Sequence, residues 1–257
     1  GEPLVRFGVL KALTEQMVGM CSELSMGYRA KLVTNGLLLD SKTTSELTRS
    51  LGIRSIEVTL DGPPAAHDTR RVRTDGKGTY EQIFSNLLAS VDAAKANGAH
   101  LRVRSNVDKR NVSSCQQLIH IFSEHGLMSK VHLYFAPVYS WGESEGQLNA
   151  FTPSEWADIS LSLGRELLNA GASGRLLPKS RITPCMHGDV HATVVSPSGE
   201  LYRCTEVPLV AAYALDAADT NPSELGYWVV PASTHSTGVG VPSWKEEIEA
   251  GRWPCRT

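Results

Sequence analysis

Three cysteines in the last third of the chain are placed to bind a metal ion or an iron–sulfur cluster. Cys185 precedes a short predicted hairpin and Cys204 ends it, so both thiolates can reach one site; Cys255 follows near the end of the sequence. Thiolates are the usual ligands of iron–sulfur clusters. The region also offers a zinc ligand set, because His187 and His191 add two imidazoles with His-x3-His spacing. A third interpretation leaves these cysteines free or merely buried.

The other two of the five cysteines carry no such signal. Cys21 and Cys115 lie on or at the start of predicted helices, without a cysteine partner nearby, and we interpret them as small buried residues. No basic-then-apolar signal segment opens the chain, so we expect a cytoplasmic protein. A disulfide is not expected in that reducing compartment.

Polar and apolar side chains alternate in three predicted strands, residues 56–61, 101–108 and 131–138. Side chains two residues apart share a face of a strand. The polar faces carry Glu57, Thr59 and Asp61, then Arg102, Arg104, Asn106 and Asp108, then His132 and Tyr134. If the apolar faces pack on helices, the polar faces line an enclosed space, as in a barrel with a ligand site in its lumen. A sheet with one face in water is the alternative, although parallel sheets seldom expose a face.

The elements that position these side chains alternate between strands and helices, which predicts an α/β fold with parallel strands and right-handed crossovers. A fourth strand is predicted at residues 31–35, and helices at residues 8–27, 43–51, 80–97, 112–125 and 153–169. The pattern lapses after residue 137. The last part is rich in Gly, Pro and Ser, with one clear hairpin formed by residues 191–195 and 201–204. We therefore expect two domains, residues 1–178 and 179–257.

The composition excludes several classes of function. A hydrophobic fraction of 41% and a charged fraction of 20% are typical of a globular protein. Lys and Arg number 25 and Asp and Glu 27, a net charge of −2, so no field gathers nucleic acid or anionic lipid. No apolar run approaches the roughly 20 residues of a membrane span. Neither nucleic acid nor a membrane is an expected partner.

Short polar motifs end the predicted strands or follow them, in a fixed order. They are Gly1-Glu2-Pro3-Leu4, Thr34-Asn35-Gly36, Thr59-Leu60-Asp61-Gly62-Pro63, His67-Asp68-Thr69-Arg70-Arg71, Gly76-Lys77-Gly78-Thr79-Tyr80, and Asn106-Val107-Asp108 with Asn111. Each alone is an ordinary turn. As an ordered set, they resemble the radical S-adenosylmethionine (radical SAM) enzymes with a C-terminal SPASM domain, such as anaerobic sulfatase-maturating enzymes and maturases of ribosomal peptides.

The resemblance implies a partial (β/α)6 TIM-like barrel, its first strand missing from these residues, followed by a small, loop-rich SPASM domain. It implies an oxidoreductase-type enzyme whose 4Fe-4S cluster reduces SAM to give a 5′-deoxyadenosyl radical, which abstracts hydrogen from a peptide or protein side chain. An electron donor such as a flavodoxin or ferredoxin would be a second partner. The CxxxCxxC loop that ligates this cluster is absent from the 257 residues, and we expect it upstream of Gly1.

The resemblance also assigns residues to SAM. Glu2 matches the residue that receives the amino group, and Thr59 stands where a Ser near the SAM carboxylate is common. The expected SAM-binding residues are Glu2, Thr34, Asn35, Thr59, Asp61, Arg71, Arg104 and Asn106. Arg71, Arg102 and Arg104 are candidate partners of the SAM carboxylate or of the substrate. Structural ion pairs with Glu57 or Asp61 are an equal alternative for the arginines of the polar faces.

The resemblance also implies that Cys185, Cys204 and Cys255 bind an auxiliary 4Fe-4S cluster. The spacing of Cys185, Gly199 and Cys204 agrees with the opening of the SPASM cysteine pattern. The alternative function is a catalytically inactive barrel that serves as a binding or scaffold module, with a Cys/His zinc site in place of the cluster. The catalytic base is not assigned.

Overall fold

The computed structural model describes residues 2–139, 149–172, 194–195, 201–202 and 229–230. The chain divides into two compact units, residues 1–140 with 145–177 and residues 141–144 with 178–257. The expected domain boundary after residue 178 lies outside the described residues and stays a prediction.

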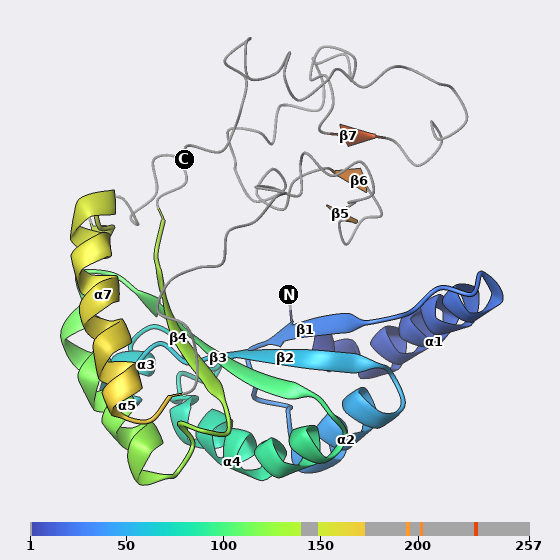
Figure 1. The fold of residues 1–257 in the computed structure, drawn as a ribbon, viewed down its shortest axis with the longest axis horizontal. Helices are drawn as coiled ribbons and strands as arrows, with labels where there is room; N and C mark the ends of the chain where they lie inside the picture. Colours follow the sequence, from blue (N-terminus) through green and yellow to red (C-terminus); the bar gives the residue numbers. More distant parts are fainter. Residues whose placement is uncertain (1, 140–148, 173–193, 196–200, 203–228, 231–257) are drawn as a thin grey trace. The chain divides into compact units, whose positions relative to one another are not determined.

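Four parallel strands form the sheet of the first unit (Figure 1). They are β1 (Ala30–Thr34), β2 (Ile53–Thr59), β3 (His100–Val107) and β4 (His132–Pro137), in the spatial order β1-β2-β3-β4. The prediction of an α/β fold with parallel strands is confirmed, and each expected strand of this region has an observed counterpart. β2 begins earlier than expected, because Ile53 pairs with Ala30 of β1, and Ser55 pairs with both Lys31 of β1 and His100 of β3.

Helices connect the strands. They are η1 (Pro3–Arg6), α1 (Phe7–Glu23), α2 (Ser41–Arg49), α3 (Pro64–His67), α4 (Tyr80–Ala96), η2 (Val112–Ser114), α5 (Cys115–Glu124) and α7 (Pro153–Asn169). Asp40 caps α2 by accepting a hydrogen bond from the Thr43 amide at 2.6 Å, and α4 stops where Gly98 adopts a φ of 68°. The four-residue helix α3 was not predicted, because one turn is too short to show a helical period.

The apolar face of the sheet packs against α2, α4 and α5. Its buried residues include Ile56, Val58, Leu101 and Val103 of the strands, with Leu47, Leu87, Leu118 and Phe122 of the helices. Burial of such a side chain contributes roughly 1.5–3 kcal/mol. This layer fixes the strands from one side and leaves the polar face of the sheet to form a site.

The polar face follows the predicted alternation. The strand register places Glu57, Arg102 and His132 in one row across the sheet, and Thr59, Arg104 and Tyr134 in the next row. Tyr134 interacts with Glu57 although β3 lies between their strands, which are about 10 Å apart at two strand spacings. Side chains that meet across an intervening strand are typical of the concave face of a barrel wall, and we call the polar face the concave face.

Helix α1 buries little of its surface in the described structure. Leu10 packs against the core, whereas Leu13, Met17 and Met20 are more than half exposed. The spacing of these four residues predicts the helix, and the structure confirms it. Most of the apolar face that they form is exposed to solvent.

The described residues of the second unit form three short antiparallel strands, β5 (Val194–Val195), β6 (Leu201–Tyr202) and β7 (Val229–Val230), in the order β5-β6-β7. The pairing of β5 with β6 confirms the predicted hairpin. β7 lies in a stretch expected to be loop, because a two-residue strand leaves no alternation to detect. No helix in the described parts of the chain has the length and hydropathy needed to cross a membrane.

A capping box starts α7 and provides a stability prediction. The Glu155 amide donates to Thr152 Oγ1 at 3.2 Å, and the Thr152 amide donates to Glu155 Oε2 at 2.7 Å. Replacing Thr152 by alanine removes the cap acceptor and is expected to lower the free energy of unfolding by about 1 kcal/mol in urea denaturation. Ser162→Ala, on an exposed position within α7, is the control and should be neutral or slightly stabilising. An equal loss in both variants would contradict a capping role.

Candidate functional site

Glu2 is held at the carboxyl end of β1 by its own chain. Its Oε1 accepts hydrogen bonds from Thr34 Oγ1 at 2.6 Å and from the Leu4 amide at 3.1 Å, and its Oε2 accepts from the Asn35 amide at 2.6 Å. A carboxylate offers about four acceptor positions, so room for a further donor remains. The structure thus brings together three of the expected SAM-binding residues, Glu2, Thr34 and Asn35.

A pocket of about 600 Å³ opens beside Glu2. It is lined by Glu2, Val5, Asn35, Leu37, Leu38, Val72, Arg73, Thr74 and Gln82. Its volume lies within the range of small-molecule sites, and its mixture of aliphatic walls and few polar groups is typical of them. A ligand with a cationic group and an apolar part therefore fits this place chemically.

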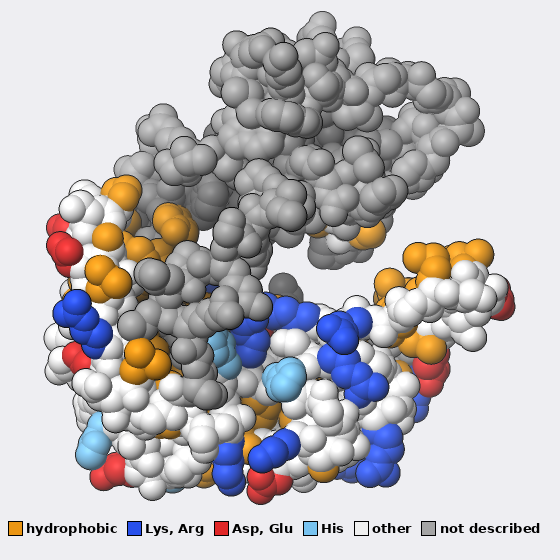
Figure 2. Space-filling view, in the orientation of Figure 1, with side chains coloured by type: hydrophobic (Ala, Val, Ile, Leu, Met, Phe, Trp, Pro, Cys, Tyr) orange, Lys and Arg blue, Asp and Glu red, His pale blue; other side chains and the backbone are white. Residues whose placement is uncertain are grey.

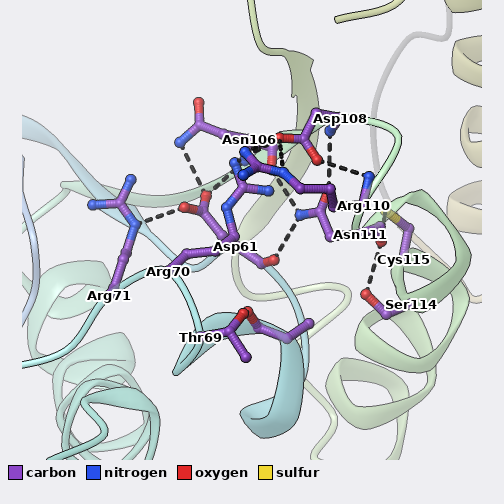
Figure 3. Close-up of polar contacts among 11 residues, drawn as sticks. Asp61, Thr69, Arg70, Arg71, Asn106, Asp108, Arg110, Asn111, Ser114 and Cys115 are labelled. Atoms are coloured by element: carbon purple, nitrogen blue, oxygen red, sulfur yellow. Dashed lines mark hydrogen bonds and ion pairs between the residues drawn. The ribbon is translucent and has the colours of Figure 1, made fainter. Parts of the chain in front are cut away.

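Asp61 is the centre of a buried polar network after β2 (Figure 3). Its Oδ2 accepts from Arg71 Nε at 2.6 Å, and its Oδ1 accepts from the amide and the Nδ2 of Asn106 at 2.8 and 3.0 Å. Asp61 is 2% exposed, so these contacts replace its hydration. Three more of the expected site residues, Asp61, Arg71 and Asn106, are thus together, and they satisfy one another.

Asp108 forms a second buried centre beside the first. Arg110 Nη2 and Arg70 Nη2 lie 2.6 and 3.2 Å from its Oδ2. Burial alone would raise the pKa of Asp108, but the hydrogen bonds from Arg110 and the charge of Arg70 hold that pKa below its usual value. Asn111 joins the centres, because its Nδ2 donates to the carbonyl of Asp61 at 2.9 Å and its Oδ1 accepts from the Asp108 amide at 2.9 Å.

Sequence reasoning did not assign roles to Asp108, Arg70 or Arg110. Alternation placed Asp108 on the polar face of its strand, and Arg70 and Arg110 lie in or beside the polar motifs. Charge alone does not tell which carboxylate an arginine meets across 38 positions of sequence, as Arg70 meets Asp108.

His67 fixes the loop between α3 and α4 from inside. Its Nδ1 accepts from the Asp61 amide at 3.0 Å, so the ring proton is on Nε2, which lies 2.9 Å from Thr79 Oγ1. A proton on Nδ1 would face the amide hydrogen. Burial is the largest cause that lowers the pKa of His67 to about 4, so the ring is neutral at pH 7.

Asp68 and Gly78 complete the same loop. Asp68 Oδ1 accepts from the amides of Thr79 and Tyr80 at 2.8 and 2.9 Å. A Cβ atom at Gly78 would overlap the Asp68 carboxylate, which explains why glycine stands there. The two motifs at residues 67–71 and 76–80 are therefore two sides of one closed loop that carries Arg71 to Asp61.

Glu57 organises the middle of the concave face. Lys31 Nζ lies 2.7 Å and Arg102 Nε 3.6 Å from Glu57 Oε2. Burial would raise the pKa of Glu57, but the hydrogen bonds from Lys31 and Tyr134 lower it overall. Burial, followed by the contact with Glu57, raises the pKa of Tyr134. Arg102 is thus next to Glu57, as in the ion-pair alternative.

Thr59 and Arg104 lie side by side in the next row of the concave face. Arg104 Nε donates to Asn106 Oδ1 at 2.8 Å, and no other described residue accepts from its guanidinium. Unlike Arg71, Arg104 has no carboxylate partner among the described residues. Its charge is therefore available to a ligand.

The cysteines divide between described and undescribed parts of the chain. Cys115 is buried as expected, with its Sγ 3.7 Å from the Asn111 carbonyl, and burial raises the pKa of its thiol to about 12. Cys21 is half-buried, and both thiols are free. Cys185, Cys204 and Cys255 lie outside the described residues. Within the described residues, no three His, Cys, Asp or Glu side chains are grouped to hold a metal ion.

Comparison with known proteins gives structural matches. No protein-family model and no curated protein matches the sequence. Native anSMEcpe with bound AdoMet is similar at a TM-score of 0.58 and 19% identity, over 79% of this chain and 58% of that one. Native anSMEcpe with bound AdoMet and Kp18Cys peptide is similar at 0.57 and 16%, over 79% and 58%. The complex with AdoMet and Cp18Cys peptide is similar at 0.54 and 16%, over 76% and 56%.

The chain thus spans less than two thirds of the length of these structures. At such identities the similarity shows the fold. It is an α/β fold whose four parallel strands are consistent with a partial TIM-like barrel, and in anSMEcpe this fold binds AdoMet, which is S-adenosylmethionine.

Proposed function

We propose that these residues belong to a radical SAM/SPASM enzyme that cleaves S-adenosylmethionine reductively and abstracts hydrogen from a peptide or protein side chain. The observation that carries the proposal is the carboxylate of Glu2, fixed beside a pocket of about 600 Å³ at the carboxyl ends of parallel strands. The fold shared with an AdoMet-binding and peptide-binding protein supports it.

Glu2 receives the amino group of AdoMet in this proposal. Thr34 and the Asn35 amide hold two of its acceptor positions at 2.6 Å, so the carboxylate is oriented before the ligand arrives. Charge-assisted hydrogen bonds between an ammonium and a carboxylate are among the strong ones. Orienting such a group in advance reduces the cost of binding.

Thr59 and Arg104 receive the carboxylate of AdoMet in the same proposal. A hydroxyl and a guanidinium are both donors, and the two side chains are neighbours across the sheet. Asp61 and Asn106 have a positioning role, because their polar atoms are used by Arg71, by Arg104 and by each other. Arg71 keeps its terminal nitrogens open to AdoMet, since only its Nε is held by Asp61 and its side chain is 37% exposed.

Cys185, Cys204 and Cys255 bind an auxiliary 4Fe-4S cluster in this proposal, and the catalytic cluster is bound by a CxxxCxxC loop outside the 257 residues. When bound, a catalytic cluster would supply the electron for AdoMet cleavage, drawn from a donor such as a flavodoxin or ferredoxin. The protein's own task is to hold AdoMet and to exclude water from the radical.

Changing Glu2 to glutamine tests the amino-group contact. The amide keeps the size of the side chain but loses its charge, so AdoMet affinity is expected to fall roughly 10- to 100-fold in calorimetric titration. Glu15→Gln, on an exposed position of α1, makes the same charge change away from the pocket and should leave affinity unchanged. Equal affinities for the wild type and Glu2→Gln would contradict the assignment.

The reaction itself is tested on the full reading frame that contains these residues. Reconstituted anaerobically with iron and sulfide and reduced with dithionite, the protein is expected to convert AdoMet to methionine and 5′-deoxyadenosine, measured by chromatography. Absence of 5′-deoxyadenosine, together with zinc in place of iron in the purified protein, would support the alternative of an inactive barrel that acts as a binding module.

A further inference from the structure

The concave face of the sheet carries more positive than negative charge. Lys31, Arg102 and Arg104 stand on it, with Glu57 as the carboxylate among them, because Asp61 is already paired with Arg71 at 2.6 Å. Figure 2 shows Lys, Arg and His side chains in the middle of the view, over the region of the strands, and others at the margin together with Asp and Glu. A half-buried surface with surplus positive charge favours an anionic ligand.

Arg102 is held in a fixed orientation on this face. Its Nε lies 3.6 Å from Glu57 Oε2, and its guanidinium carbon lies 5.0 Å from the centroid of the Tyr134 ring. Tyr134 in turn hydrogen-bonds to Glu57. Glu57 is 3% exposed, so the carboxylate that orients Arg102 cannot turn outward without leaving its partners. An arginine can stack over an aromatic ring and still donate hydrogen bonds from its planar guanidinium group, which a lysine cannot do.

The donors of Arg102 are not satisfied by the part of the chain that the structure describes. Its Nε is buried without a hydrogen-bond partner, and no described residue accepts from its terminal nitrogens. The side chain is 37% exposed, so its terminal nitrogens are open to a ligand, while buried polar groups such as Nε nearly always have a partner in native proteins. His132 lies beside it in the same row, and burial followed by the charge of Arg102 lowers the pKa of His132. Its neutral ring can add a hydrogen bond without adding charge.

We infer that Arg102, with Lys31 and His132 beside it, binds the carboxylate of an Asp or Glu side chain of the peptide substrate. A carboxylate matches the two parallel donors of a guanidinium. This inference rests on the proposed function. AdoMet also has a carboxylate, but Arg102 lies two residues nearer the amino end of β3 than Arg104, whereas Glu2 and its pocket lie at the carboxyl ends. The position therefore favours the peptide.

The test uses the full 257-residue chain and two probe peptides, acetyl-Ala-Asp-Ala-amide and acetyl-Ala-Asn-Ala-amide, in NMR titrations. They have the same shape and differ in one charge. The Asp probe is expected to bind about tenfold more tightly than the Asn probe. Arg102→Gln is expected to abolish this preference. Arg49→Gln, which removes the same charge from an exposed position of α2, is the matched control and should leave the preference intact.

Titration of AdoMet into the same proteins separates this inference from the proposed function. Equal binding of the two probes to the wild type would overturn the inference, whatever the AdoMet result. Loss of AdoMet affinity in Arg102→Gln with an unchanged Asp preference would assign the contact to the cofactor and also overturn it. If Arg102→Gln does not fold, Arg102→Lys replaces it. Arg102→Lys keeps the positive charge but loses the paired guanidinium donors, so the preference for the Asp probe is expected to fall. An unchanged preference would count against the inference.

Discussion

Replacing Asp61 by asparagine is expected to lower the free energy of unfolding by about 3 kcal/mol. The amide takes away the charge that Arg71 faces at 2.6 Å, and it replaces one of the two accepting oxygens by an NH2 group, which cannot accept the hydrogen bonds made there. Because Asp61 is 2% exposed, water does not replace the lost partners. Urea denaturation of the purified chain, followed by circular dichroism, measures the change.

The matched control is Asp92→Asn. Asp92 lies 3.6 Å from Lys130 in a pair whose two side chains are 82% and 44% exposed. Exposed ion pairs contribute roughly 0–1 kcal/mol, so this variant should unfold nearly as the wild type does. Losses of equal size in the two variants would show that Asp61 is not the centre of a buried network.

The second large effect is a loss of stability in acid caused by His67. Its pKa is lowered from 6.5 to about 4 in the folded protein, so between these values the unfolded state binds more protons. The stabilising contribution is complete above pH 6.5 and is lost as the pH falls toward 4, by about 3 kcal/mol in total. Protonation of Nδ1 would also break its hydrogen bond from the Asp61 amide.

Comparison of the wild type with His67→Asn isolates this contribution from other acidic groups. Asparagine does not titrate, so the difference in unfolding free energy between the two proteins should shrink by about 3 kcal/mol from pH 7 to pH 4. His120→Asn, at an exposed position of α5, should change stability by less than about 0.5 kcal/mol at either pH. A constant difference for His67→Asn across that range would mean that the pKa of His67 is the same in the folded and unfolded states.

Much of the first unit could be predicted from periodicity. The alternation in β2 and β3 places Glu57 and Arg102 on one face, and the strand register confirms that they are neighbours. Helix α7 begins and ends where its pattern indicated, because Thr152 and Pro153 give a strong start signal. These features depend on residues close in sequence.

Partnerships between distant residues could not be predicted in the same way. Alternation indicates that Asp61 and Asn106 share a face, but not that both oxygens of Asp61 are used by Arg71 and Asn106. The neutral state of His67 depends on the Asp61 amide that faces it, which only the folded loop reveals. The SAM-binding and cluster-binding roles stay predictions, since no comparison assigns them to these residues.

The most direct test of the account is a crystal structure of the chain soaked with AdoMet. We predict AdoMet in the pocket beside β1, with its amino nitrogen about 2.8 Å from a carboxylate oxygen of Glu2. Its carboxylate should reach beyond the residues that line this pocket, to Thr59 and Arg104. AdoMet bound elsewhere, or with its amino group away from Glu2, would contradict the account.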